Sequence, residues 1–146
     1  MIIFHIFPLF CYFSISDRDP RKQFSITDVR PELTFCLFSA SGSSPSLIVL
    51  QNEEKIDEEM RKYARQYISK HIRIDLPSKN LELPGLLKTY WADFGGNKLK
   101  VLRRVTRDMK GAGKEYDDLL QISKENFDLL KTIKLSFSNL DWTPCL

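Results

Sequence analysis

The chain has 146 residues, which is enough for one compact domain with a buried core. Apolar residues make up 42% and charged residues 28%, which excludes global disorder. The formal net charge of +3 does not by itself indicate a nucleic-acid partner. His5 and His71 are the only histidines, which excludes a histidine-rich metal site, and we predict no metal and no cofactor.

Residues 1–16 form an almost wholly apolar segment that contains Pro8 and is shorter than a typical membrane span. No Lys or Arg precedes Arg18, whereas a secretory signal begins with a positive region and ends in a small-residue cleavage site. We therefore predict no membrane span. A secretory signal, a buried strand and an aberrant start of a truncated gene product are the alternatives for this segment.

The three cysteines, Cys11, Cys36 and Cys145, have no metal-ligand spacing. A sparse, odd set favours a reducing compartment, so we expect a cytoplasmic protein. Cys36 lies in an apolar run, which favours an inert, buried thiol over a nucleophile.

The first predicted elements surround a serine-rich turn. A charged, proline-bearing turn at 17–21 is followed by an ambiguous stretch, a short strand or a loop, at 23–29. The β-favouring run 33–38 predicts a strand buried on both faces, and after the turn the run 47–50 predicts a second short strand.

The middle of the chain predicts a helix and a hairpin. Asn52 is suited to cap a helix over 52–70, whose apolar residues recur at helical spacing. Residues 72–76 alternate like a half-buried strand, and 80–83 can return as its partner.

The last third predicts further helices and a closing strand. Pro84 opens a short helix that runs through Phe94 and ends at Gly95-Gly96. Two more helices are expected at 97–109 and 114–130, and a strand at 132–137. These elements predict an α+β fold, in which short strands alternate with several packed helices in a partial or truncated single domain.

Four motifs in order resemble the family catalogued as domain of unknown function 547. The first two are Asp19-Pro20-Arg21-Lys22-Gln23-Phe24 and the stretch Pro31-Glu32-Leu33-Thr34-Phe35-Cys36-Leu37-Phe38-Ser39-Ala40-Ser41-Gly42-Ser43-Ser44-Pro45. The others are Thr89-Tyr90-Trp91-Ala92-Asp93-Phe94-Gly95 and Leu140-Asp141-Trp142. Residues 17–146 thus resemble the C-terminal part of that family's domain.

The chain departs from the family pattern where chemistry is expected. The family's strand histidine is Thr34 here, its strand-end cysteine is Ser39, and a cysteine often seen before the proline is Ser44. The resemblance implies a part of a larger protein, since animal members look like C-terminal parts of proteins with glutaredoxin-like and DEP domains. It also suggests, by fold analogy alone, a distant kinship to papain- or transglutaminase-like thiol enzymes.

The first functional hypothesis is a thiol- or serine-hydrolase-like enzyme. Ser39 or Ser44 would be the nucleophile, and His71 its base. The alternative, which we favour, is that the serines satisfy their own turn and that His71 closes a helix, where a cation is favourable.

The second hypothesis is a non-catalytic interaction or regulatory module, and it is our prediction. The motif positions Tyr90, Asp93, Phe94, Asp141 and Trp142 are retained, and we read the two carboxylates as structural partners of aromatic side chains and turns. A protein partner or a missing upstream segment is expected to cover exposed apolar surface.

The third hypothesis is nucleic-acid binding through a basic helix. The residues concerned are Lys98, Lys100, Arg103, Arg104, Arg107, Lys110 and Lys114. Asp108 interrupts this cluster and no aromatic side chain is interleaved with it, so a solvated basic helix is the favoured interpretation.

Overall fold

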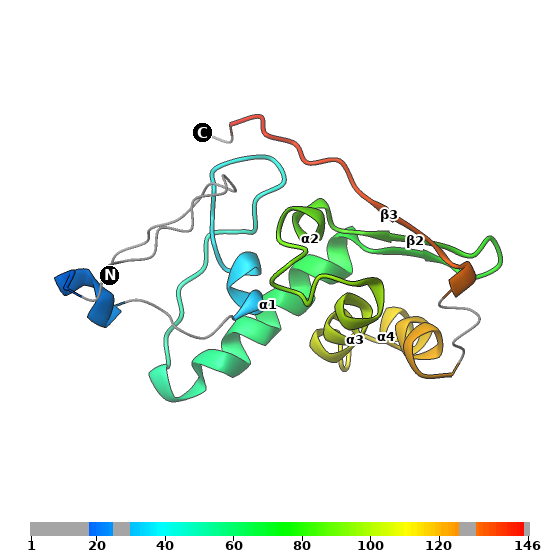
Figure 1. The fold of residues 1–146 in the computed structure, drawn as a ribbon, viewed down its shortest axis with the longest axis horizontal. Coiled ribbons are helices and arrows are strands. Elements are labelled where there is room, and N and C mark those ends of the chain that lie inside the picture. The colour runs from blue at the N-terminus through cyan, green and yellow to red at the C-terminus, as the bar shows by residue number, and fades with distance from the viewer. Residues whose placement is uncertain (1–17, 25–29, 126–130, 145–146) are drawn as a thin grey trace.

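The computed structural model describes residues 18–24, 30–125 and 131–144, and these form an α+β fold, as predicted (Figure 1). The helical elements are η1 (Pro20–Phe24), η2 (Pro31–Phe35), η3 (Glu53–Lys55), α1 (Ile56–His71), α2 (Gly85–Thr89), α3 (Lys98–Asp108), α4 (Lys114–Leu120) and the π-helical turn η4 (Gln121–Glu125). The strands are β1 (Arg73–Asp75), β2 (Asn80–Leu83) and β3 (Lys134–Phe137).

The sheet has β2 at its centre. β1 pairs with it antiparallel, with Ile74 opposite Leu81, and this confirms the predicted hairpin. β3 pairs with the other edge in parallel, with Leu135 also opposite Leu81. The closing strand therefore joins the hairpin from a distant part of the chain, and its continuation runs back along the molecule towards the C-terminus (Figure 1).

The hydrophobic core lies between α1, α3, α4 and the sheet. Its largest fully buried apolar side chains are Phe35, Ile68, Leu81, Leu83, Leu87, Val101, Leu102, Val105, Met109, Leu119 and Ile122. Each helix contributes an apolar stripe at helical spacing, which is how a surface helix attaches to a core. This packing holds η2, α1 and α3 next to one another.

The two best-defined helices, α1 and α3, form where they were predicted, and the predicted Asn52 cap forms as well. The Asn52 side chain accepts a hydrogen bond from the Glu54 N–H at 3.0 Å, at the turn that leads into α1. Asn97 does the same for the Lys100 N–H at 2.9 Å and caps α3. These side chains satisfy N–H groups that have no partner within the first turn of a helix.

The predicted strand over 33–38 is wrong. Pro31–Phe35 form a 3₁₀-helix, in which the Leu33 N–H bonds to the Arg30 carbonyl oxygen at 3.0 Å. Proline is well suited to the first helical position, and the buried residues Pro31, Glu32, Thr34 and Phe35 form two pairs that are three positions apart, which fits the three-residue turn of a 3₁₀-helix. β-favouring composition was overridden by packing against α1.

The predicted strand over 47–50 is also wrong, since this segment forms no ladder with other described residues. Leu47 and Val49 are 76% and 69% exposed, so the apolar run lies on the surface. Trp142 is 58% exposed as well. Exposed apolar side chains had been expected, but not at a segment interpreted as a strand.

Two predicted helices differ in length. The helix after Pro84 ends at Thr89, and 90–95 continue as turns, which lets Trp91 pack edge-on against Phe137 with ring centroids 5.7 Å apart. The helix predicted over 114–130 is α4 followed by η4 as far as residue 125, and 126–130 lie outside the described residues. The predicted segment 1–16 also lies outside them, as does most of 23–29. Among the described helices, none is long and apolar enough to cross a bilayer.

Candidate functional site

The serine-rich turn is held by hydrogen bonds among its own residues. The Ser39 N–H donates to Ser44 Oγ at 2.7 Å, and this hydroxyl donates to the Pro45 carbonyl oxygen at 3.1 Å. Ser39 Oγ lies 3.1 Å from Ser41 Oγ. Ala40 adopts a left-handed backbone with φ +53°, which is unusual for a residue with a side chain. The candidate nucleophiles thus have structural partners within the turn.

The C-terminal segment fastens this turn from outside. Ser43 exchanges bonds with Asp141: its N–H donates to the Asp141 carbonyl oxygen at 3.0 Å, and its Oγ accepts from the Asp141 N–H at 2.6 Å. The Gly42 N–H donates to the Thr143 carbonyl oxygen at 3.0 Å. The Asp141 carboxylate accepts from the Thr143 N–H at 2.9 Å. Hydrogen bonding with the Thr143 side chain, followed by this backbone bond, lowers the pKa of the carboxyl. Asp141 is therefore a turn-forming carboxylate.

His71, the candidate base, is engaged at the end of α1. Its Nδ1 lies 2.8 Å from the Tyr67 carbonyl oxygen, and its ring centroid lies 4.3 Å from that of Tyr67. The Tyr67 hydroxyl donates to the Ser43 carbonyl oxygen at 2.7 Å, and burial raises its pKa to about 12. Within the described residues no hydrogen bond joins His71 to Ser39 or Ser44, so the serine–histidine mechanism stays a prediction without an assembled pair.

The Cys36 thiol sits against η2. Its Sγ donates to the Glu32 carbonyl oxygen at 3.5 Å, and burial, followed by the charge of Glu32, raises its pKa to about 11. A thiol with such a pKa is protonated at neutral pH, whereas the thiolate is the nucleophile. The geometry thus supports the interpretation of Cys36 as inert.

Positions from separate family-like motifs meet in the core. The Phe35 ring lies 5.7 Å from that of Phe94 and 5.4 Å from that of Tyr67. Thr34 and Pro45, from the second motif, are also buried. Tyr90, from the third motif, is half-buried, and its burial, followed by the charge of Asp93, raises its pKa. These motif residues act in packing.

Other motif positions have different environments. Asp93 is exposed, as is Trp142. Asp19, Pro20 and Arg21 begin or precede η1, which lies at one end of the molecule, away from α2 (Figure 1). The structure therefore brings together the second, third and last motifs, but not the first.

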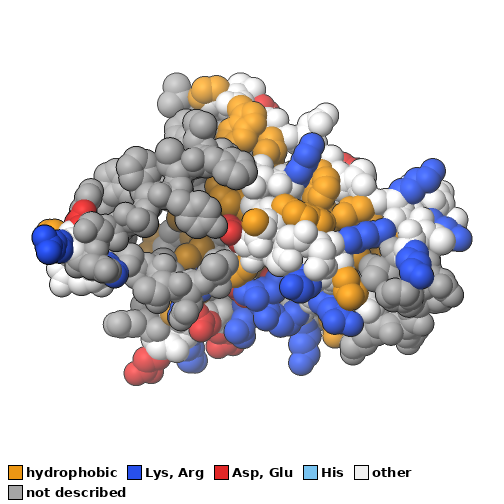
Figure 2. Space-filling model, in the orientation of Figure 1, with side chains coloured by type: hydrophobic (Ala, Val, Ile, Leu, Met, Phe, Trp, Pro, Cys, Tyr) orange, Lys and Arg blue, Asp and Glu red, His pale blue; other side chains and the backbone are white. Residues whose placement is uncertain are grey.

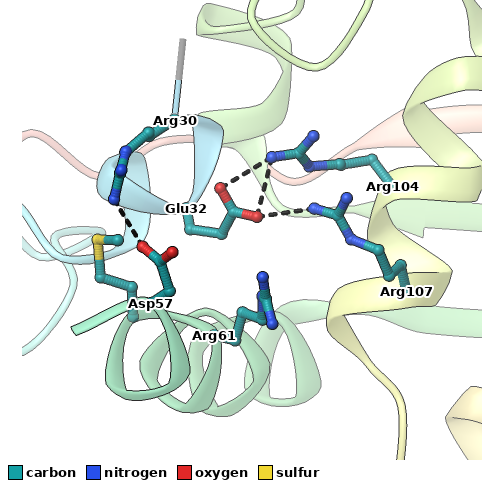
Figure 3. A pocket seen from close by; sticks show the side chains of 7 residues that line it. Arg30, Glu32, Asp57, Arg61, Arg104 and Arg107 are labelled. Atoms are coloured by element: carbon teal, nitrogen blue, oxygen red, sulfur yellow. Dashed lines mark hydrogen bonds and ion pairs between the residues drawn. The ribbon is translucent and has the colours of Figure 1, made fainter. Parts of the chain in front are cut away.

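A charged cluster on η2 and α3 is the site that the sequence did not predict. Arg104 donates from one nitrogen to both carboxylate oxygens of Glu32, each at 2.9 Å, and Arg107 donates to one of them at 2.7 Å (Figure 3). The Glu32 side chain is only 9% exposed, whereas those of Arg104 and Arg107 are 29% and 51% exposed. The Glu32 carboxylate is thus buried, whereas the Arg104 and Arg107 side chains are partly exposed to solvent.

The charges in this cluster perturb one another. Burial would raise the pKa of Glu32, but its own backbone N–H, Arg104 and Arg107 outweigh burial and hold the pKa below the ordinary 4.5. Asp108, whose side chain is fully buried, behaves in the opposite way. Burial and then the charge of Glu32 raise its pKa to about 6, although Arg107 lies 3.3 Å away. One Asp108 oxygen has no hydrogen-bond partner among the described residues.

Two hollows open beside these arginines, where Lys and Arg side chains gather below the centre of the face in Figure 2. The first has a volume of about 270 Å³ and is lined by Arg30, Glu32, Asp57, Met60, Arg61, Arg104 and Arg107. Arg30 bonds to Asp57 at 2.6 Å, and Arg61 extends from α1 into the same space (Figure 3). Arg104 and Arg107 also line the second hollow, of about 410 Å³.

The first hollow carries more positive than negative charge. Its lining holds four arginines and two carboxylates, so the formal balance is positive by two. Arg61 has no hydrogen-bond or ion-pair partner among the described residues. Arg guanidinium groups bind carboxylate or phosphate oxygens in a planar, two-point geometry. The arrangement can therefore hold an anionic group.

The basic helix was predicted to be a solvated surface, but only some of its basic side chains are exposed to solvent. Lys98 is half-buried and donates to the Ile133 carbonyl oxygen at 2.7 Å, and its burial lowers the lysine pKa. Arg104 and Arg107 are bound to Glu32, whereas Lys100, Arg103 and Lys110 are exposed. The sequence did contain a signal for the cluster: one acidic residue in an apolar run, and two arginines three positions apart beside an apolar helix stripe.

No group of three or more His, Cys, Asp or Glu side chains in the described part of the chain is arranged to hold a metal ion. Comparisons with known proteins give no relative: no family model, no curated protein and no solved structure matches this chain. The resemblance to domain of unknown function 547 therefore stays a prediction, and function has to be argued from the geometry of the chain itself.

Proposed function

We propose that this chain is a non-catalytic protein-interaction module of the kind of domain of unknown function 547, and that it binds an acidic segment of a partner protein. The observation that carries the proposal is the first hollow, where four arginines line one space with two carboxylates. The hydroxyls of Ser39 and Ser44 are occupied within their own turn, which supports a non-catalytic role.

Protein rather than nucleic acid is favoured by the shape and sign of the surface. Glu32 and Asp57 divide the positive charge of the lining, so the hollow offers places for separate carboxylate groups but no continuous run of cations for a phosphate backbone. Exposed aromatic stacking partners, which single-stranded nucleic acids use, are absent from its lining. An acidic peptide can place one carboxylate against Arg61, which lines the hollow and has no ion-pair partner among the described residues.

The test is binding of a fluorescein-labelled oligo-glutamate peptide, followed by fluorescence anisotropy at low salt. We expect saturable binding to the native chain and about a tenfold loss with Arg61→Gln, because an exposed guanidinium that bonds a carboxylate contributes on the order of 1–2 kcal/mol. Arg73→Gln is the matched control, since Arg73 is an exposed arginine on β1 outside both hollows. It should leave the affinity unchanged.

Two results would overturn the proposal. Equal affinity of the Arg61→Gln and Arg73→Gln variants would show that the peptide responds to net charge and not to the hollow. Tighter binding of an oligonucleotide of equal charge would show that the hollow prefers nucleic acid to an acidic peptide. Separately, labelling of Ser39 or Ser44 by a fluorophosphonate probe would favour the hydrolase hypothesis over a non-catalytic module.

A further inference from the structure

The second hollow shares Arg104 and Arg107, the two arginines that bind Glu32, with the first hollow. Its lining residues are Asp93, Phe94, Gly95, Lys100, Arg103, Arg104 and Arg107. The Arg104 Nε is buried and has no hydrogen-bond partner among the described residues. Lys100 and Arg103 are exposed and make no hydrogen bond or ion pair from their side chains within that part of the chain. The side chains that line this hollow therefore carry more hydrogen-bond donors than the described residues provide acceptors for.

The charge balance of this hollow differs from that of the first. Four cationic side chains line it with a single carboxylate, that of Asp93, so the formal balance is positive by three. Glu32 offsets part of this charge through its ion pairs with Arg104 and Arg107. A single carboxylate ligand would leave cations unmatched. A phosphate monoester carries about −1.5 to −2 charges at neutral pH and has three acceptor oxygens.

The wall of the hollow includes a glycine that packs closely against Lys100. Gly95 has a φ of +108°, which disfavours a side chain, and a Cβ there would lie 2.7 Å from the Lys100 Cβ. The buried Phe94 lies beside it. The hollow, of about 410 Å³, is large enough for a phosphorylated side chain beside these cations.

We propose that the second hollow binds a phosphate monoester, such as phosphoserine in the acidic partner segment. This proposal rests on the proposed function, because it names the group that the partner presents beside its acidic residues. Arg103 and Lys100 bind the phosphate oxygens, and Arg104 and Arg107, which also line the hollow, add positive charge. Arg61, in the first hollow, binds the neighbouring carboxylate.

The experiment compares three labelled acidic peptides that differ only at a central Ser, Glu or phosphoserine. We expect the phosphoserine peptide to bind the native chain about tenfold more tightly than the Glu peptide, since one added charge-assisted hydrogen bond is worth on the order of 1.4 kcal/mol. Arg103→Gln should remove this preference, whereas Arg61→Gln should weaken all three peptides alike. Lys100→Gln is a second variant, and Arg73→Gln is the control.

The outcomes separate the two proposals. If the phosphoserine and Glu peptides bind the native chain equally, the phosphate site is refuted while acidic-segment binding stands. If none of the peptides binds, both are refuted. Inorganic phosphate is also tested as a competitor. If it displaces the phosphoserine peptide at the same concentrations at which inorganic phosphate itself binds the chain, the site recognises the phosphate group, which supports the proposal. Unchanged thermal unfolding of the exposed-residue variants shows that a loss of binding is not a loss of fold.

Discussion

Asp108 is the residue at which burial and charge conflict most. Its side chain is fully buried, one carboxylate oxygen lacks a partner among the described residues, and its pKa is raised to about 6. A raised carboxyl pKa means that folding favours the protonated form. The stability contributed by this proton is fully present below the ordinary pKa of 3.8 and is lost as the pH rises through about 6.

We expect Asp108→Asn to increase the free energy of unfolding above about pH 6 by about 1–3 kcal/mol, because each pKa unit corresponds to about 1.4 kcal/mol. Near pH 4 the native chain and the variant should converge, in about the range where Asp is ordinarily half-protonated. Urea unfolding across this pH range measures the difference. Asp117→Asn, an exposed residue of α4, is the control. A variant that is less stable than the native chain at neutral pH would contradict the prediction.

At the scale of elements, α1 holds the serine-rich turn through a single side chain. The Tyr67 hydroxyl donates to the Ser43 carbonyl oxygen, and the C-terminal segment closes over the same turn. The turn thus depends on two elements that are far from it in sequence. Loss of either contact, from α1 or from the C-terminal segment, should therefore loosen the serine-rich turn.

Tyr67→Phe should leave the packing with Phe35 intact and remove the tie to the turn. We expect a loss of about 1 kcal/mol in the free energy of unfolding, the usual net value of one hydrogen bond. Faster hydrogen exchange of the amides in 39–45 should accompany it. Tyr63→Phe, at a half-buried tyrosine of the same helix, should change neither quantity. Unaltered exchange in the Tyr67 variant would show that the hydroxyl does not hold the turn.

Gly85 marks the contact of α2 with the segment after β3. A Cβ at this position would lie 2.4 Å from the Ser138 carbonyl oxygen and 2.9 Å from Leu140 Cγ. Gly85→Ala must therefore displace backbone, and overpacking of this kind costs about 1–3 kcal/mol. Chemical denaturation measures the loss, with exposed Lys88→Ala as the control on the same helix. Equal stability of the two variants would indicate that this contact yields easily.

The elements that sequence reasoning predicted well are those specified locally. Periodic apolar residues and an asparagine cap define α1 and α3, and the alternation at 72–76 with a turn defines the hairpin. The 3₁₀-helix at Pro31–Phe35 was missed because its residues favour strands while its shape is set by packing. The parallel pairing of β2 with β3 was missed because nothing local encodes a partner so far along the chain.

At the scale of the whole molecule, the Glu32 cluster joins two distant parts of the chain. Glu32 is separated from Arg104 and Arg107 by 72 and 75 positions. This distance explains why the candidate site escaped prediction. The positive charges of α3 were visible in the sequence, but the carboxylate that organises them was not identifiable as their partner.

We expect Glu32→Gln to lower the free energy of unfolding at neutral pH by about 1–3 kcal/mol, because a charged acceptor for two arginines is lost. The native pKa lies below 4.5, so this contribution is present above that value and is lost as the pH falls through the lower, folded pKa. The native chain should therefore lose stability on acidification more steeply than the variant. Glu58→Gln, an exposed change on α1, is the control. Parallel pH profiles for Glu32→Gln and the native chain would contradict the prediction.

The small sheet has a consequence for self-association. Its outer strands, β1 and β3, are three and four residues long, and charged residues such as Arg73, Asp75 and Lys134 occupy them. Short edges that carry charge are poor templates for the addition of a foreign strand, which is the route by which sheets grow into aggregates. Strand-to-strand growth along these edges is thus disfavoured, and we expect the chain not to add foreign strands at β1 or β3.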